Sequence, residues 1–550
     1  MNNGKSAEEE IRFLLDQVKQ GLIDGAHAVK ALEISRFNEI LHPVINAGGV
    51  EGLPKWTGGI SGAPGAAVGR VYFSSGALLK ARKLALRRGE DTHCILVLPF
   101  TLADDVKAIE VAAGVLTAQG GFSAHASVMA RQYGKVSLVA PEMNITGKRA
   151  SLGALVFGEG DTVTLDVPGS GISAVYLGAA EITEPNLAGS ALFDFIALAK
   201  GFIKNFQIRS NAETPADLER ALSFGAEGIG LCRTEHMFFK PHRINTFREL
   251  ILSDSDAARK NALEKIKVMQ RDDFYRIFKI MAGKDVTIRL LDAPLHEFMP
   301  RSDTELMGYL DHISRTETLC TRDEIIARIE MLNEFNPMLG RRGCRIAISY
   351  PEIYAMQVRA VFEAVQTLRD ENIDVRPEIM IPLVMNAAEL KTIVFGKRVT
   401  GADYTGIADI APLPFKVGAM IELPAAVLGA ASIARYAQFF SFGTNDLTQT
   451  TLGLSRDDAA GSMPAYTHYD LLEGNPFMVL DEGVKELISL GVNRGRLTRP
   501  DLVCGLCGEQ GADPAAIRFC IDSGIDYVSC SPYAVPVAIL AAAQIQLEKQ

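Results

Sequence analysis

The 550-residue sequence has few cysteines, and this already excludes one class of protein. Its eight cysteines are irregularly spaced and do not form the pattern of a disulfide framework. Long hydrophobic runs are also missing, and no apolar stretch reaches the length of about 18 residues that a membrane-spanning helix needs. The first residues lack the charged-then-apolar pattern of a signal peptide. We therefore expect a cytoplasmic protein with mostly reduced thiols and no membrane association.

Positive charge is scarce as well, with 56 Lys and Arg against 66 Asp and Glu, a formal net charge of −10. This balance argues against nucleic-acid binding through bulk charge, although it allows a local cationic pocket. Apolar residues make up 48% of the chain and charged residues 22%, as in ordinary soluble proteins. The length predicts about three to four domains, or two to three if one is a barrel.

The N-terminal half shows two kinds of pattern. Residues 1–50 are predicted to form a helical connector, with a second helix expected over residues 26–41. Residues 51–180 begin with a glycine-rich stretch, alternate short strands with short helices, and end in a predicted hairpin at 162–178. The first helix of the connector has an apolar face made of Ile11, Leu14, Leu15, Val18 and Leu22.

After a predicted linker at 181–205, β-rich runs alternate with helical stretches over residues 206–550, which favours an α/β fold with a parallel sheet. There is one run more than a (β/α)8 barrel needs, and CRIAIS (344–349) is the weakest. The runs are 206–212, 228–233, 285–292, 344–349, 378–383, 415–422, 439–443, 503–509 and 526–531. A barrel keeps its chemistry at the C-terminal ends of its strands, and polar residues stand there. They are Arg233, Arg289, Glu422, Asn445, Asp446 and Cys507.

The segment GGFSAHASVMARQYGK (120–135) places two glycines before a predicted helix that opens at His125. A helix N-terminus favours an anion, so a histidine there could carry a phosphoryl group. The spacing alone favours a histidine that only caps or packs.

This segment resembles the phosphohistidine signature of the enzymes that use phosphoenolpyruvate (PEP). Six further motifs resemble the pyruvate, phosphate dikinase family, in the same order. They are AEGIGLCRTEHMFF (226–239), TIRLLDAPLHEF (287–298), NPMLGRRGCRIAISYPEIY (336–354), SFGTNDLTQTTLGLSRDDA (441–459), CGEQGADPAAI (507–517) and IDYVSCSPYAVPVAILAAAQ (525–544). The resemblance covers roughly residues 10–545 and implies a swivelling β/β/α phosphohistidine domain at 51–180, followed by a (β/α)8 TIM-type barrel at 206–550.

The resemblance implies a role for each polar residue. His125 would carry the phosphoryl group, and Cys507 would protonate C3 of the enolate with a thiol of near-normal pKa. Arginines can donate bidentate hydrogen bonds to phosphate and carboxylate groups, and Mg²⁺ prefers oxygen ligands such as carboxylates. The residues implied to bind PEP or pyruvate are Arg233, Arg289, Arg342, Gly443, Thr444, Asn445 and Asp446, and those implied to bind Mg²⁺ are Glu422 and Asp446. Cys504, although it forms a CxxC pair with Cys507, is expected to be a buried small hydrophobe.

The sequence departs from the family pattern at several positions. Ala425, Gln510 and Ala534 stand where the dikinases have Arg, His and Arg, and Ser123-Ala124 replace the Thr-Ser that precedes the histidine. The N-terminal ATP-grasp domain of the dikinases has no counterpart here, since the sequence starts where that domain would have ended. We therefore expect the nucleotide site to lie elsewhere.

The predicted function is a phosphotransferase with paired acceptors that interconverts PEP and pyruvate through a phosphohistidine, as the catalytic part of a dikinase-like system. A separate ATP-grasp protein would be the partner, and a homodimer through the barrel is implied by the resemblance. One alternative is an enzyme I-like phosphotransferase that passes the group to a phosphocarrier protein. A second alternative is a PEP- or pyruvate-sensing protein without turnover.

Overall fold

The computed structural model describes residues 6–549 except 47, 102–104, 120–126, 128–129, 131–133, 169–170, 186, 188, 239–240, 253–255, 301–302, 316–320, 400–401, 412–414, 456–465, 467–468, 470, 473–475 and 478. The predicted phosphoryl carrier His125 and its neighbours Ser123 and Ala124 lie outside the described residues. Within the described part of the chain, no helix combines the length and the apolar character needed to cross a bilayer.

The chain begins with three helices, α1 (Ala7–Lys19), α2 (Gly25–Ala31) and α3 (Ser35–Leu41). Ser6 and Glu9 form a capping box at the start of α1, and its predicted apolar face is buried at Ile11, Leu14 and Leu15. The single helix predicted over residues 26–41 is wrong. Leu32 takes an extended backbone (ψ 124°) and turns its side chain into the core, which separates α2 from α3.

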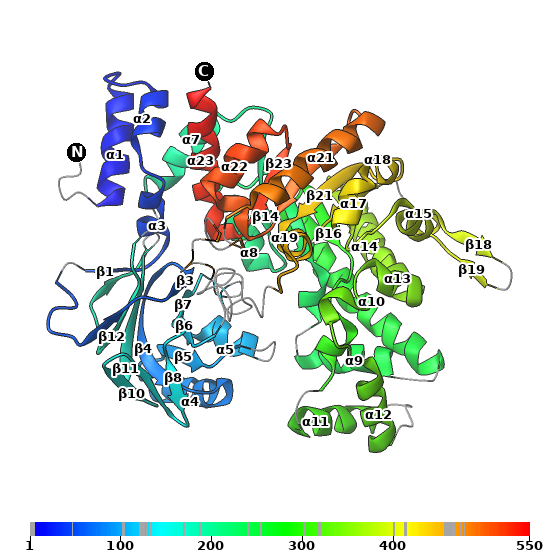
Figure 1. Ribbon diagram of the computed structural model, residues 1–550, viewed down its shortest axis with the longest axis horizontal. Helices are drawn as coiled ribbons and strands as arrows, with labels where there is room; N and C mark the ends of the chain where they lie inside the picture. The colour runs from blue at the N-terminus through cyan, green and yellow to red at the C-terminus, as the bar shows by residue number, and fades with distance from the viewer. Residues whose placement is uncertain are drawn as a thin grey trace.

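These helices share one hydrophobic core with the C-terminal part of the chain. In Figure 1 the blue α1 and α2 stand beside α7 (Leu192–Lys200) and the red C-terminal helix α23 (Val535–Glu548), and α2 contacts both. Gln544 of α23 donates hydrogen bonds to the carbonyl oxygens of Val29 and Leu32 at 2.8 and 2.7 Å, which satisfies the open end of α2. The connector is therefore fastened to the body that follows residue 206.

The second unit is an α/β domain around an eight-stranded sheet of order β2-β12-β11-β4-β5-β6-β7-β3. Its centre, β4 to β7, is parallel, and the hairpin predicted at 162–178 is confirmed as the antiparallel pair β11–β12. Two hydrophobic clusters fill its two faces. The elements are β2 (Lys55–Thr57), β3 (Ile60–Ala63), β4 (Gly65–Tyr72), α4 (Ser75–Arg88), β5 (Cys94–Leu98), α5 (Val106–Val111), β6 (Gly114–Thr117), β7 (Val136–Val139), β8 (Asn144–Thr146), β9 (Arg149–Leu152), β10 (Leu155–Gly158), β11 (Thr162–Val167) and β12 (Ala174–Leu177).

The two chain segments that enter and leave this domain are paired with each other. Strand β1 (Val44–Ile45) lies antiparallel to β13 (Ile182–Thr183), and the Asn46 amide N–H donates to the Glu181 carbonyl at 2.9 Å. Both connections of the domain therefore run side by side at one place.

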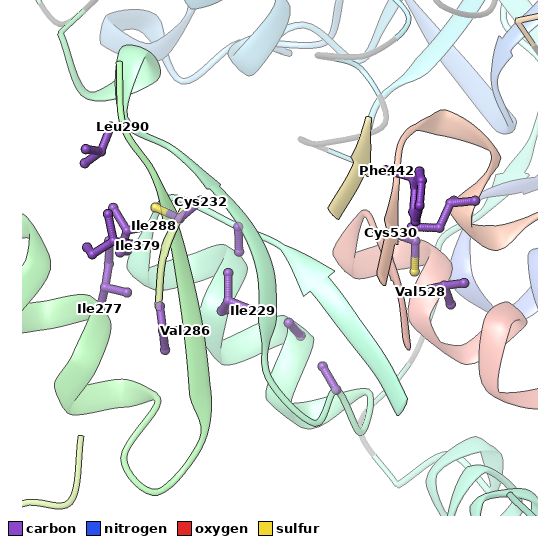
Figure 2. Close-up of a cluster of buried hydrophobic side chains, with 14 of the residues drawn as sticks. Ile229, Cys232, Ile277, Val286, Ile288, Leu290, Ile379, Phe442, Val528 and Cys530 are labelled. Atoms are coloured by element: carbon purple, nitrogen blue, oxygen red, sulfur yellow. The ribbon is translucent and has the colours of Figure 1, made fainter. Parts of the chain in front are cut away.

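Eight parallel strands close into a barrel, which confirms the predicted α/β class and the (β/α)8 architecture. The last strand pairs with the first through Gln207 to Ser210 against Tyr527 to Cys530. Figure 2 shows part of the core, with Ile229, Val286, Ile288 and Ile379 among the apolar side chains that the strands contribute. The strands are β14 (Gln207–Asn211), β15 (Ile229–Arg233), β16 (Asp285–Arg289), β17 (Arg376–Ile381), β20 (Lys416–Ile421), β21 (Phe439–Gly443), β22 (Val503–Cys507) and β23 (Tyr527–Cys530).

The run CRIAIS, the weakest of the nine candidate strands, forms helix α13 (Cys344–Ser349), which confirms that it is not a strand of the barrel. A short apolar run has no periodicity that separates a strand from a buried helix. The remaining α-helices of the barrel are α8 (Pro215–Ser223), α9 (Pro241–Leu252), α10 (Asp256–Ile280), α11 (Asp303–Ile313), α12 (Arg322–Leu332), α14 (Pro351–Asp370), α15 (Ala387–Phe395), α16 (Ile407–Ile410), α17 (Pro424–Leu428), α18 (Ala430–Ile433), α19 (Thr444–Leu452), α21 (Glu482–Thr498) and α22 (Pro514–Asp522). A two-stranded ribbon, β18 (Lys397–Val399) and β19 (Ala402–Tyr404), projects beside α15 (Figure 1).

Candidate active site at the C-terminal rim of the barrel

The strands deliver polar side chains to one rim of the barrel, as the sequence predicts. Arg233, Arg289 and Cys507 are the last residues of β15, β16 and β22. Glu422 follows the end of β20 directly, and Gly443 ends β21 where α19 begins. Because all the strands are parallel, these ends meet at the same face of the barrel.

Arg289 lies in the most charged part of the rim. Its guanidinium donates a hydrogen bond to Glu235, and its Nη1 lies 3.0 Å from Oδ2 of Asp292. Burial opposes the charged form of Arg289, but the carboxylates of Glu235, Asp292 and Glu422 outweigh this cost and raise its pKa. Its Nε is buried and has no hydrogen-bond acceptor among the described residues. This leaves one N–H available to an oxygen of a bound ligand.

Arg342 lies in the loop before α13 and joins two carboxylates. Its Nε and Nη2 donate to Oδ1 and Oδ2 of Asp292 at 3.1 and 2.7 Å, a bidentate pair. Its Nη1 and Nη2 also donate to the carboxylate of Asp446 at 3.2 and 3.3 Å. Arg342 therefore connects the end of β16 to the start of α19.

Arg233 has a looser partner. Its Nη1 lies 3.6 Å from Oε1 of Glu213, and its backbone N–H donates to the same oxygen at 3.3 Å. Each of the three arginines is thus matched with a buried carboxylate that the sequence reasoning missed, namely Glu213, Glu235 and Asp292. A usable signal existed, because each of the three stands at the end of a predicted strand or within two residues after it, and so falls at the same rim.

Glu422 has an incomplete set of partners. It is 1% exposed, and its Oε1 accepts the backbone N–H of Leu383 at 2.6 Å. Leu383 adopts φ 54°, a region that is uncommon for residues other than glycine. Oε2 of Glu422 is buried with no hydrogen-bond donor among the described residues. Burial, followed by the nearby charges of Asp446 and Asp292, raises the pKa of Glu422.

These features suit a hard divalent cation. Two carboxylates, Glu422 and Asp446, lie close enough for their charges to repel, and one buried oxygen is unpartnered. Oxygen ligands of this kind are those that Mg²⁺ prefers. Gly443 keeps the space open, since a Cβ at this position would lie 2.8 Å from Oε2 of Glu422. No group of three His, Cys, Asp or Glu side chains in the described ranges could hold a metal by itself.

Cys507 differs from expectation in its acidity. The thiol is 1% exposed, accepts a hydrogen bond from Ser441 Oγ at 3.1 Å, and lies 3.6 Å from the carbonyl oxygen of Phe442. Burial raises the pKa of Cys507 to about 11, so the prediction of a near-normal thiol pKa is wrong. The thiol is protonated at neutral pH and can act as a proton donor. Cys504 is fully buried, which confirms its expected role as a small core residue.

Gln510, one of the departures from the family pattern, lies directly behind this site. It is 1% exposed, accepts a hydrogen bond from Thr444 Oγ1 at 2.6 Å, and donates to the carbonyl of Phe477 at 3.0 Å. It fixes the first residue of α19, which is followed by Asn445 and Asp446. Ala425 is exposed on α17, and Ala534 ends a short 3-10 helix (Pro532–Ala534).

The residue before Ala534 joins the barrel to the α/β domain. The ring of Tyr533 lies 5.7 Å from the ring of His42 and 4.6 Å from the guanidinium carbon of Arg220. It also packs against Gly134, where a Cβ would lie 2.4 Å from the tyrosine ring. Gly134 thus brings the α/β domain into contact with the barrel.

The fold and the rim define a (β/α)8 barrel that carries arginines and carboxylates at the C-terminal ends of its strands and is joined to a second α/β domain. The family model described as "PEP-utilising enzyme, PEP-binding domain" matches residues 194–547. A second model, "PEP-utilising enzyme, mobile domain", matches residues 90–168. The chain therefore belongs to the PEP-utilising enzymes.

Three similar curated proteins are each named pyruvate, phosphate dikinase. The protein of Treponema pallidum (strain Nichols) is 56% identical over 558 residues, covering 99% of this chain and 62% of the relative. The protein of Rhizobium meliloti (strain 1021) is 44% identical over 98% of this chain and 59% of the relative. That of Clostridium symbiosum is 40% identical over 100% of this chain and 61% of the relative. The chain thus spans about three fifths of the length of these relatives.

Proposed function

We propose that this chain interconverts PEP and pyruvate through a phosphohistidine at His125, as the catalytic part of a pyruvate, phosphate dikinase-like phosphotransferase. The main observation behind this proposal is that three groups lie at one rim of the barrel. They are the protonated, buried thiol of Cys507, the Nε–H of Arg289 without an acceptor among the described residues, and the Oε2 of Glu422 without a donor among them. An anion acceptor, a metal-ligand position and a proton donor are the groups that this reaction needs.

In the direction toward pyruvate, Arg233, Arg289 and Arg342 bind the phosphate and carboxylate of PEP. The P–O bond of PEP breaks, and a bond forms between phosphorus and a ring nitrogen of His125, in line with the leaving oxygen. The enolate that remains takes the proton of Cys507 at C3 and becomes pyruvate. A Mg²⁺ ion held by Glu422 and Asp446 would supply positive charge against the substrate oxygens.

The backbone at Gly443 and Thr444 and the side chain of Asn445 lie at the turn from β21 into α19, and we propose that they contact the substrate. A Cβ at Gly443 would lie 2.8 Å from Oε2 of Glu422, so only a residue without a side chain leaves room beside the proposed metal ligand. Gln510 supports the same turn through its hydrogen bond with Thr444.

We also propose a domain motion, a partner protein, an oligomeric state and a location for this chain. The α/β domain would swivel about the paired connections β1 and β13 to carry His125 between the barrel and a nucleotide site. That second site would belong to an ATP-grasp partner. A homodimer through the barrel and a cytoplasmic location complete the proposal.

The test is the intact mass of the full chain after incubation with PEP and Mg²⁺ but without ATP. We expect an acid-labile phosphoryl adduct that is absent in His125→Ala and present in His27→Ala, a matched control at an exposed histidine of helix α2. Binding of PEP without any adduct would overturn the proposal. Transfer from the adduct to a small carrier protein, but not to an ATP-grasp protein, would favour the enzyme I-like alternative.

A further inference from the structure

Glu213 occupies a special position at the rim. It follows β14 and precedes α8, and its side chain is only 3% exposed. Its Oε1 accepts the backbone N–H of Arg233 at 3.3 Å and lies 3.6 Å from Nη1 of the same arginine. Nδ1 of His236 lies 3.8 Å from that oxygen. One carboxylate oxygen therefore faces three nitrogen groups from β15 and the turn after it.

Arg233 has the weakest pairing of the three rim arginines. Arg289 and Arg342 each contact two carboxylates, with contacts of 3.0 Å or less to Asp292. Arg233 has one carboxylate partner among the described residues, at a distance beyond a normal hydrogen bond. It is also the most exposed of the three, at 15% against 9% and 6%. An incoming anion can therefore displace the partner of Arg233 more readily than those of the other two.

The surroundings of Glu213 make its charge depend on Arg233. The pKa of Glu213 is raised to about 7, mainly by burial and in addition by the charges of Asp217 and Glu235. The guanidinium and the N–H of Arg233 act in the opposite direction. His236 also faces this carboxylate. When an anionic ligand neutralises Arg233 and brings a second negative charge, protonation of Glu213 becomes more favourable.

We propose that Glu213 is a positioning residue for Arg233. Before the substrate binds, the Glu213 carboxylate pairs with the guanidinium of Arg233. When an anionic group of the substrate takes the place of this carboxylate at Arg233, Glu213 takes up a proton from solvent. When the product leaves, the proton returns to solvent and the pair forms again. No bond other than O–H forms or breaks at Glu213. The inference rests on the proposed function, because PEP is the anion considered.

The direct test is proton uptake on PEP binding, measured by calorimetry in two buffers of different ionisation enthalpy near pH 7.5. A His125→Ala background prevents phosphoryl transfer and leaves the rim intact. If the bound anion raises the pKa of Glu213 to about 9, within the usual effect of a nearby like charge, binding takes up more than about 0.5 proton per PEP. We expect this contribution to disappear in Glu213→Gln and to persist in Glu213→Asp.

Glu227→Gln is the matched control. Glu227 also accepts a backbone N–H, that of Ile208 at 3.1 Å, and lies 3.8 Å from a cation, Lys200, but it belongs to the opposite end of the barrel. Proton uptake should be unchanged in this variant. A thermal melt of each variant checks its folding, and Glu213→Asp provides the readout if Glu213→Gln does not fold.

A kinetic measurement distinguishes positioning from a purely structural role. In the His125-containing chain, Glu213→Gln should lower KM for PEP at pH 7.5 by about threefold, with kcat within about threefold of the original, because the neutral amide no longer competes with PEP for Arg233 and the reacting atoms are unchanged. The KM of the original chain should change between pH 6 and 8 more than that of the variant. Equal proton uptake in Glu213→Gln and its parent, with PEP bound to both, would overturn this inference alone. Absence of PEP binding to the parent would overturn the proposed function as well.

Discussion

Removing Asp292 should destabilise the barrel strongly, because this one carboxylate joins two buried guanidiniums. Its oxygens lie 3.1 and 2.7 Å from Arg342 and 3.0 Å from Arg289. In Asp292→Ala, Arg342 retains Asp446 and Arg289 retains Glu235, so part of the pairing survives. Loss of one partner of a buried ion pair costs about 3–5 kcal/mol.

That free energy corresponds to a fall in Tm of about 10 °C, taking about 2–4 °C per kcal/mol for a large domain. Thermal unfolding at pH 7.5, followed by circular dichroism, measures it. The exposed pair of Asp311 with Arg315 gives the control, and Asp311→Asn should change stability by less than about 1 kcal/mol. A Tm for Asp292→Ala within about 2 °C of the original chain would refute the reasoning.

The pH dependence of the same effect has a definite sign. Burial alone would raise the pKa of Asp292, but the guanidiniums of Arg342 and Arg289 outweigh it and lower the pKa. A lowered pKa stabilises the fold above the unfolded value of about 3.9, and this stabilisation is lost as the pH falls toward the folded value. The Tm difference between the original chain and Asp292→Asn should therefore be constant from pH 8 to 5 and shrink below about pH 4.

Three further outcomes are expected. Mg²⁺ should raise the Tm of the original chain, by the equivalent of about 2.7 kcal/mol at 100-fold excess over Kd. It should not raise the Tm of Glu422→Gln or Asp446→Asn, and equal shifts in all three proteins would contradict the proposed metal site. Cys507→Ala should slow exchange of pyruvate methyl protons with D2O by about 100-fold or more, measured by NMR, whereas unchanged exchange would exclude the thiol as proton donor. Tyr533→Ala should weaken the contact between the α/β domain and the barrel, because the ring packs against Gly134. The radius of gyration from small-angle X-ray scattering should then increase, and an unchanged value would show that this contact does not hold the two domains together.

The barrel could be predicted because its signal is local. Each strand is a short run rich in apolar residues, most of these runs end at or next to a polar or glycine residue, and helices of different periodicity separate them. Where the prediction failed, a distant contact decided the outcome. Leu32 has a helical neighbourhood in sequence, yet its side chain is 1% exposed in the core and its carbonyl accepts from Gln544 of α23. No local pattern contains that partner.

The site could be predicted only in part, for the same reason. Motif resemblance pointed to the arginines and to Glu422 and Asp446, and the strand ends explain why they meet. Their counterions could not be assigned, because Glu235 lies 54 residues from Arg289 and Asp292 lies 50 residues from Arg342. The raised pKa of Cys507 could not be predicted from the sequence either, because it depends on burial by several strands.

The charges of the rim explain why two of its carboxyl groups differ from the rest. Three guanidiniums face five carboxyl groups, which are Glu213, Glu235, Asp292, Glu422 and Asp446. If all five were ionised the rim would carry two excess negative charges, an unfavourable setting for the anionic substrate proposed above. Glu213 and Glu422 both have raised pKa values, and Nη1 of Arg233 lies 3.6 Å from Glu213, beyond a normal hydrogen bond. A proton on Glu213 and a divalent cation at Glu422 would each remove one source of repulsion, so that the guanidiniums remain available to the substrate.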